Sequence, residues 1–347
     1  MKRLFILAAA TVALASCAKT QVVYNEELQE IAFRQVENVM TKTNPSLGDW
    51  ADGSMGVFAY KAGEANPYFT NANFAKHSTQ LYWVGNGTQY YWPFQGALDF
   101  YFYAPHQETG ASVSVANKEL TISAFTNKNY EYEDDTPYVG SGTGLNYNCA
   151  DLMYGSDIIT KSKDEAVDNE GIPVTLKHAL ALVQVNVKAT TENLVTILSM
   201  TLKETPADAK LTVNYTGSPI TGSPNWADDS PGQKLDLTIF KTTTTIPSAT
   251  ITESFTQLGN EVLVIPGQVQ TSFSIEYKLA NSDPNAVFIA TLPLSGTWEP
   301  GKRYVYNISF GLEEIKFAPV VEDWGTGEVV ATENGGVSVA AVPQPEP

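Results

Sequence analysis

The chain has 347 residues, 38 of them acidic and 21 basic, which gives a formal net charge of −17. This acidic surplus excludes a nucleic-acid-binding protein, because such proteins depend on cations that neutralise phosphates. A content of 43% hydrophobic and 17% charged residues is typical of a folded chain, and the length predicts about two domains. Two cysteines and three histidines are too few for a disulfide scaffold and argue against a zinc or iron–sulfur protein.

The first sixteen residues are predicted to be an export signal. Lys2-Arg3 precedes an apolar run from Leu4 to Leu14, which is shorter than a transmembrane helix requires. The run ends in Leu14-Ala15-Ser16-Cys17, the pattern of a bacterial lipobox, in which the cysteine is acylated and the chain is cut before it. Ordinary signal cleavage beside a cysteine is the alternative. We therefore predict a lipoprotein signal peptide at 1–16 and a lipid anchor on Cys17.

Short alternating segments, separated by Gly, Pro, Asn and Asp, predict an all-β chain. The clearest strands are expected at Met55–Lys61, Ala97–Ala104, Ser112–Ala116, Leu120–Ala124, Ala181–Ala189, Lys210–Tyr215, Glu261–Ile265, Phe273–Leu279, Val287–Leu294 and Arg303–Phe310. Turns are expected at Gly85–Gly87, Asn117-Lys118, Pro206–Asp208, Gly217–Pro219 and Pro300-Gly301. Two stacked sheets per domain, a β-sandwich, would bury such strands.

Aromatic side chains are concentrated between Tyr82 and Tyr103. Exposed Trp83 and Trp92 would suit stacking against sugar rings. The alternation of Leu98, Phe100 and Phe102 with polar or amphipathic residues instead favours core packing. Both interpretations stay open for the two tryptophans at this point.

A domain boundary is predicted near residues 160–172, where Lys161–Gly171 is the most polar stretch of the chain. A solvated loop inside one domain could have the same composition. We place an N-terminal domain up to residue 165 and a C-terminal domain at 166–342. The proline-rich end, 343–347, is expected to be an extended tail.

The sequence contains no arrangement of residues that indicates catalysis. The three histidines are scattered, and none of the common nucleophile, zinc-protease or phosphate-binding motifs is present. The acidic pairs Asp134-Asp135 and Asp228-Asp229 lie in turn-rich segments typical of solvated surface, and Cys149 has no nearby histidine. We expect no enzyme, no catalytic residue, no metal and no cofactor.

The chain resembles the fimbrillins, the lipoprotein pilus subunits of Bacteroidales. The resemblance rests on an ordered set of motifs spread over most of the chain. These are the lipobox at Cys17, Ile31-Ala32-Phe33, Thr41-Lys42, Gly56–Tyr60, Tyr91-Trp92-Pro93, Leu98-Asp99-Phe100, Asp151–Tyr154, Leu176–Ala181, Trp298–Tyr304 and Ile315–Trp324.

The resemblance implies two tandem transthyretin-like β-sandwich domains and assembly by strand exchange. In polymerising fimbrillins a trypsin-like protease cuts after a basic residue and removes the first strand. Ile31, Phe33 and Val39 lie in an amphipathic segment suited to that strand. Lys42, before Asn44-Pro45, is the expected cleavage site, and Arg34, inside the strand, is the less favoured one. Residues 17–42 would then be a propeptide and 43–165 the N-terminal domain.

The family mechanism fills the opened groove with a C-terminal strand from the next subunit. Residues 336–342 supply a candidate donor strand, with Val337, Val339 and Ala341 on one side. A last strand that stays in its own sheet is the alternative.

The sequence therefore predicts a structural subunit of a cell-surface fimbrium, held at the outer membrane through Cys17 before processing. Its partners would be copies of itself or related fimbrial subunits. The alternative is a non-polymerising surface lipoprotein or a tip adhesin that binds a glycan or a host ligand through aromatics such as Trp83 and Trp92.

Overall fold

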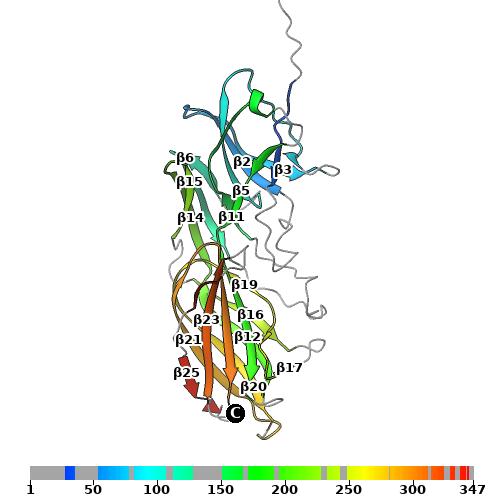
Figure 1. The fold of residues 1–347 in the computed structure, drawn as a ribbon, viewed down its shortest axis with the longest axis vertical. Coiled ribbons are helices and arrows are strands. Elements are labelled where there is room, and N and C mark those ends of the chain that lie inside the picture. The colour runs from blue at the N-terminus through cyan, green and yellow to red at the C-terminus, as the bar shows by residue number, and fades with distance from the viewer. Residues whose placement is uncertain are drawn as a thin grey trace, which may run out of the picture.

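A computed structural model describes residues 28–35, 54–77, 82–106, 112–127, 151–166, 171–190, 195–227, 233–242, 248–280, 282–311, 314–323, 329–332, 337–340 and 342–343. In these ranges the chain forms strands and one 3₁₀ helix, η2 (Lys163–Glu165), so the prediction of an all-β chain is confirmed. Figure 1 shows an elongated molecule with an upper group of strands above a lower group. Among the described residues, no helix has the length and apolar character needed to span a membrane.

The upper group is built on a nine-stranded sheet. Its order is β10 (Ile172–Val174), β1 (Phe33–Gln35), β4 (Trp83–Gly85), β3 (Pro67–Lys76), β2 (Ser54–Lys61), β5 (Ala97–Ala104), β8 (Met153–Gly155) and β11 (Leu176–His178), with β9 (Ile159–Ser162) paired to β5. Strands β10 and β11 stand at opposite ends of this order, yet only Thr175 separates them in the chain, so the sheet rolls around its own core. Both faces of β2 are buried: Val57 points into the core inside the roll and Phe58 into a second core outside it.

A four-stranded sheet covers the outer face of the roll. Its order is β15 (Thr221–Ala227), β14 (Asp208–Thr216), β7 (Glu119–Thr126) and β6 (Val113–Ala116). Leu120, Leu211 and Val213 of this sheet share a hydrophobic core with Phe58 and Tyr101 of the roll. We call the rolled sheet and this cover the upper unit.

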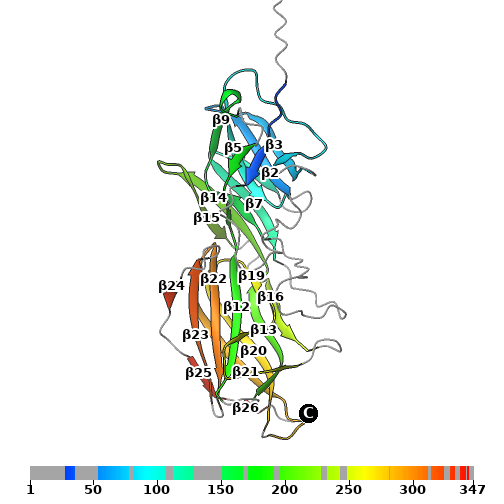
Figure 2. The same cartoon turned by 45° about the vertical axis from the view of Figure 1, so that its right-hand side comes forward.

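The lower group, visible from a second side in Figure 2, is a β-sandwich that we call the lower unit. One sheet has seven strands: β18 (Thr256–Gln257), β12 (Ala181–Ala189), β22 (Lys302–Phe310), β23 (Glu314–Asp323) and β24 (Val329–Thr332), with β19 (Val262–Val264) on β12 and β25 (Val337–Ala340) on β23. The other has six: β16 (Lys234–Lys241), β13 (Val195–Pro206), β20 (Gly267–Leu279), β21 (Phe288–Trp298) and β26 (Val342–Pro343), with β17 (Ala249–Thr250) on β13. Val183 and Ile308 meet Ile197 and Phe273 in the core between the sheets.

The chain crosses from the lower unit to the upper unit at Ala207. Strands β13 and β14 flank this single residue but belong to different sheets. The turn predicted at Pro206–Asp208 is therefore wrong, because the chain continues onward there and pairs β14 with β7. The β14–β15 hairpin, β10 and β11 all fall within 166–342 and pair with strands of the upper unit. The division of the chain at residue 165 stays a prediction.

The strongest alternating segments were located correctly. The structure has a strand at each of the ten predicted places, with identical bounds for β5 and β12. The Asn117-Lys118 turn is confirmed by positive φ angles of 52° and 62° at those residues. Strands with irregular patterns, such as β3 and β13, were not predicted.

Candidate functional site

The segment Leu28–Gln35 is bound by backbone hydrogen bonds on both of its edges. On one edge the Ile31 amide donates to the Tyr90 carbonyl at 2.7 Å, and the Trp92 amide donates to the Gln29 carbonyl at 3.0 Å. On the other edge the Ile172 amide donates to the Ala32 carbonyl at 2.8 Å, and β1 continues parallel to β10. Without this segment, both neighbours would present unpaired peptide groups. We call the place between Trp83, Tyr90–Trp92 and Gly171–Val174 the first-strand slot.

Two side chains anchor the segment in the core of the rolled sheet. Ile31 and Phe33 are 0% exposed. The Phe33 ring lies edge-on to the rings of Phe74, Phe100 and Phe102, with centroid separations of 5.0, 5.2 and 5.1 Å. Edge-to-face contacts at these separations are favourable beyond the area that they bury. We call the three surrounding rings the phenylalanine pocket.

Gly171 allows the segment to lie close to β10. Its φ of +79° favours glycine, and a Cβ at this position would lie 2.9 Å from the carbonyl carbon and 3.0 Å from the amide nitrogen of Phe33. These distances are shorter than any normal contact between a methyl group and backbone. A residue with a side chain at position 171 would therefore push the segment out of the slot.

The two candidate cleavage residues differ in what surrounds them. Arg34 is half-buried within β1, and its backbone pairs with Pro173. A protease requires an accessible extended chain, which the centre of a paired strand does not offer. Lys42 lies outside the described residues, as do Cys17, Val39 and Cys149.

The candidate donor segment pairs within its own chain in this structure. β25 runs antiparallel to β23, with Val337 opposite Phe317 and Val339 opposite Ile315. β26 then pairs with β21, in the other sheet of the lower unit. The side chains of Val337 and Val339, and all of Ala341, lie outside the described residues. The candidate donor segment therefore pairs with both sheets of its own sandwich in this structure.

Trp83 and Trp92 belong to the core of the rolled sheet. Each is 6% exposed, and Trp92 lies edge-on to Phe100 with centroids 5.7 Å apart. This burial supports the core-packing interpretation and leaves neither indole with a free face for a sugar ring in this conformation. The large aromatics on the surface of the described residues are Phe94, Tyr68 and Phe255.

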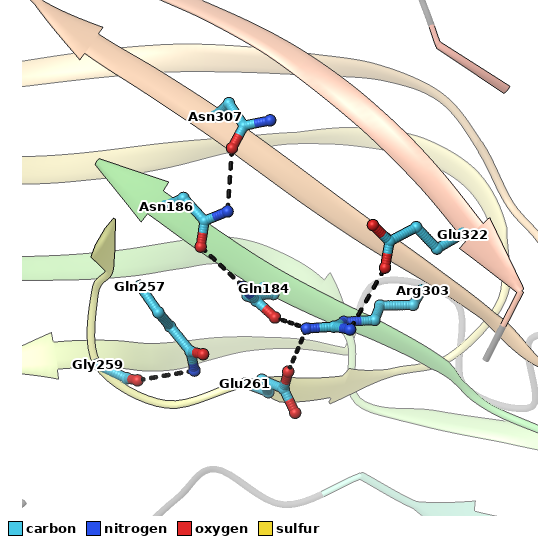
Figure 3. A network of polar contacts seen from close by, with 8 residues as sticks. All are labelled: Gln184, Asn186, Gln257, Gly259, Glu261, Arg303, Asn307 and Glu322. Carbon is cyan, nitrogen blue, oxygen red and sulfur yellow. Dashed lines mark hydrogen bonds and ion pairs between the residues drawn. The ribbon is translucent and has the colours of Figure 1, made fainter. Parts of the chain in front are cut away.

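A polar network on the lower unit was not predicted. Figure 3 shows Arg303 of β22 placed between Glu261 and Glu322, with ion-pair distances of 3.1 and 3.3 Å. Arg303 also donates to Gln184, and the chain of amides continues through Asn186 to Asn307. Burial raises the pKa of the Glu261 carboxyl to about 7; the Arg303 guanidinium opposes this rise and the Glu322 carboxylate adds to it.

The described residues contain no group of acidic, histidine or cysteine side chains that could hold a metal ion.

Comparisons with known proteins agree with the architecture. A family model described as fimbrillin-like matches residues 41–324. A candidate cell-adhesion protein from Bacteroides uniformis aligns with 85% of this chain and 98% of its own, at 14% identity and a TM-score of 0.52. A second, from Bacteroides ovatus, covers 86% and 98% at 14% identity and a TM-score of 0.50. The C-terminally truncated tip fimbrial protein Mfa3 of Porphyromonas gingivalis covers 86% and 99% at 12% identity and a TM-score of 0.41. No curated protein sequence matches the chain.

Proposed function

Because the chain belongs to the fimbrillin-like family, whose members are non-enzymatic structural and adhesion proteins, we propose that it is a structural subunit of a fimbrium that polymerises by strand exchange. Family membership implies a cell-surface location and assembly with other fimbrial subunits. The finer proposal concerns how the subunits join, and the first-strand slot is its physical basis.

The observation that carries the proposal is the way in which Leu28–Gln35 is held. The segment fills a complete strand position, with hydrogen bonds along both edges and two side chains fully buried. Its only covalent connection to the rest of the sheet runs through the residues that follow Gln35. One cut in that connection would make the strand a separate, replaceable peptide.

The proposed sequence begins with export and acylation of Cys17 at the outer membrane. A trypsin-like protease then cuts after Lys42, which removes the lipid together with residues 17–42. The C-terminal strand of another subunit enters the opened slot, where main-chain hydrogen bonds provide affinity and alternate side chains fill pockets. Burying two side chains the size of Ile31 and Phe33 contributes on the order of 3–6 kcal/mol before the entropic cost. Contacts of this head-to-tail kind build open filaments.

Mapping the mature N-terminus tests the processing step. Filaments sheared from cells are expected to contain subunits that begin at Thr43 and carry no lipid, because cleavage after Lys42 separates Cys17 from the folded chain. Mass spectrometry of the intact filament subunits measures both features. Acylated Cys17 in every filament-borne copy would contradict the proposal.

Deleting residues 336–347 tests the donor step. The truncated subunit keeps its first-strand slot, so we expect it to accept a strand from another fimbrial subunit but to donate none. Added to processed fimbrial subunits that retain their C-terminal strands, it should shorten filaments in proportion to its amount, as measured by electron microscopy. Circular dichroism controls for folding, since β25 and β26 also pair with β23 and β21. Filaments of normal length built from the truncated subunit alone would disprove the donor role.

A further inference from the structure

We propose that the first-strand slot selects a strand with a large aromatic residue two positions from an aliphatic one, and that its preferred donor is therefore a different subunit rather than a second copy of this chain. This inference rests on the proposed strand exchange and names the partner chemistry at the same slot. It follows from the shape of the phenylalanine pocket and from the composition of the chain's own C-terminal segment.

The phenylalanine pocket is matched to a ring. Phe33 is 0% exposed and contacts Phe74, Phe100 and Phe102 edge-on, at interplanar angles of 71°, 80° and 82°. Trp92 packs edge-on against Phe100 from beside it. A closely packed core relaxes only partly when a side chain is shortened, so a smaller occupant of the phenylalanine pocket leaves a cavity.

The C-terminal segment of this chain has no residue of the required size. After Trp324, the sequence contains no Phe, Tyr or Trp up to Pro347. Because side chains alternate along a strand, the sequence predicts Val337, Val339 and Ala341 on one face of the candidate donor strand and Ser338, Ala340 and Val342 on the other. Valine is therefore the largest side chain that this candidate donor strand could place against the three rings.

The backbone contacts prevent a strand from shifting sideways to close such a cavity. Hydrogen bonds at Ile31 and Ala32 fix the segment from opposite edges, and Gly171 brings the β10 side to within contact distance of Phe33. Strands bound in the slot can therefore differ only in the size of their side chains. The spacing of two residues between the buried positions is the same in either strand direction, so this rule does not depend on how the donor enters.

Competition between peptides tests the inference on the full chain. A site for a sequence-specific protease is placed after Lys42, the folded protein is cut, and a labelled peptide of residues 28–37 is exchanged into the slot. Four unlabelled peptides then compete for it: residues 28–37, the same peptide with Phe33→Ala, residues 334–345, and that peptide with Val339→Phe. Fluorescence anisotropy gives the affinity of each. The Val339→Phe change places a ring two residues after Val337, which reproduces the spacing of Ile31 and Phe33.

We expect Phe33→Ala to weaken binding by about 100-fold or more, the usual consequence of emptying a phenylalanine site in a core. The native tail peptide should bind as weakly as that variant, and Val339→Phe should strengthen it at least tenfold. A native tail peptide within about threefold of residues 28–37 would overturn the inference, as would a slot that takes up none of the four peptides.

This result is separable from the proposed function. If cells leave the chain uncut, the proposed processing fails, whereas the ranking of peptides measured on the artificially cut protein still holds. If the native tail binds tightly and subunits still polymerise, strand exchange stands and a second copy of this chain is the donor.

Discussion

Glu261 illustrates how one buried charge connects separate strands of the lower unit. The residue is 4% exposed, and its carboxylate accepts a hydrogen bond from Arg303 at 3.1 Å. Arg303 is shared with Glu322, so a single cation faces two carboxylates. Burial outweighs the attraction of Arg303, and the pKa of Glu261 rises from 4.5 to about 7.

This raised pKa predicts a pH-dependent stability. Between pH 4.5 and 7 the folded chain holds a proton on Glu261 that the unfolded chain releases, so this group's contribution to stability falls as the pH rises through that window. The loss is complete above pH 7 and amounts to about 3 kcal/mol. Glu261→Gln stays neutral, so we expect a gain in stability below about 1 kcal/mol at pH 5 and of up to about 3 kcal/mol at pH 8. Urea unfolding at pH 5, 6.5 and 8 measures the difference.

Glu64→Gln is the matched control, because Glu64 lies exposed in the upper unit. Its urea midpoints should follow those of the wild type at each pH. A Glu261→Gln variant less stable than the wild type at pH 8 would show that the ion pair with Arg303 outweighs the cost of burying the charge.

Single residues differ in whether their role could be predicted from the sequence. The alternation of Ile31 and Phe33 was sufficient to predict an amphipathic strand, because side chains alternate sides along any strand. The Arg303 network could not be predicted. Gln184, Glu261, Arg303 and Glu322 come from separate parts of the chain. Only the pairing of β12 with β19, of β12 with β22 and of β22 with β23 brings them together.

At the scale of the element, Gly171 determines whether β1 can dock. Alanine at a φ near +80° is strained wherever it occurs, at a cost of about 1 kcal/mol. Gly87 has a similar φ of +74° with no atom within 4 Å of the Cβ position, whereas the Gly171 Cβ would overlap the Phe33 backbone. We expect Gly87→Ala to cost only the strain and Gly171→Ala to lose a further 2 kcal/mol or more of folding free energy, since β1 must leave the slot.

Hydrogen exchange distinguishes the two glycine variants directly. The Ile31 amide, bonded to the Tyr90 carbonyl, should exchange as slowly as in the wild type in Gly87→Ala and much faster in Gly171→Ala. Equal protection of Ile31 in both variants would mean that the rolled sheet absorbs the added methyl group without releasing β1.

The regularity of each strand explains which strands were predicted and which were not. β12 has Val183, Val185 and Val187 on one face and was located residue for residue. β3 was missed because only two of its ten residues are buried and because Asn71, with a φ of +43°, interrupts its regular geometry. The crossing at Pro206–Asp208 has the composition of a turn, and the pairing of β14 with β7 across distant parts of the chain overrides that local preference.

For the whole molecule, the decisive feature is a core shared by the two units. Leu182 and Leu263 belong to the seven-stranded sheet of the lower unit, yet they pack in the same cluster as Tyr101 of the rolled sheet and Leu211 of the β14–β15 hairpin. Polar contacts cross the same junction. The Asn127 side chain donates to the Leu263 carbonyl at 3.1 Å. The molecule in Figure 1 is therefore joined by packed side chains as well as by the chain itself.

The shared core predicts that the two units unfold together and that replacing one leucine in it makes them unfold separately. Leu182→Ala removes packing at the junction, whereas Leu292→Ala removes an equally buried leucine from the core of the lower unit alone. Each substitution should lower the free energy of unfolding by about 2–5 kcal/mol. Differential scanning calorimetry should give one transition for the wild type and, at lower temperature, for Leu292→Ala, but two for Leu182→Ala. A single transition in Leu182→Ala would mean that the β13–β14 crossing couples the units without help from the shared core. In the proposed filament, this coupling would carry force from the slot in the upper unit through the junction to the candidate donor strand in the lower unit, so a variant that separates the two units should also weaken the filament.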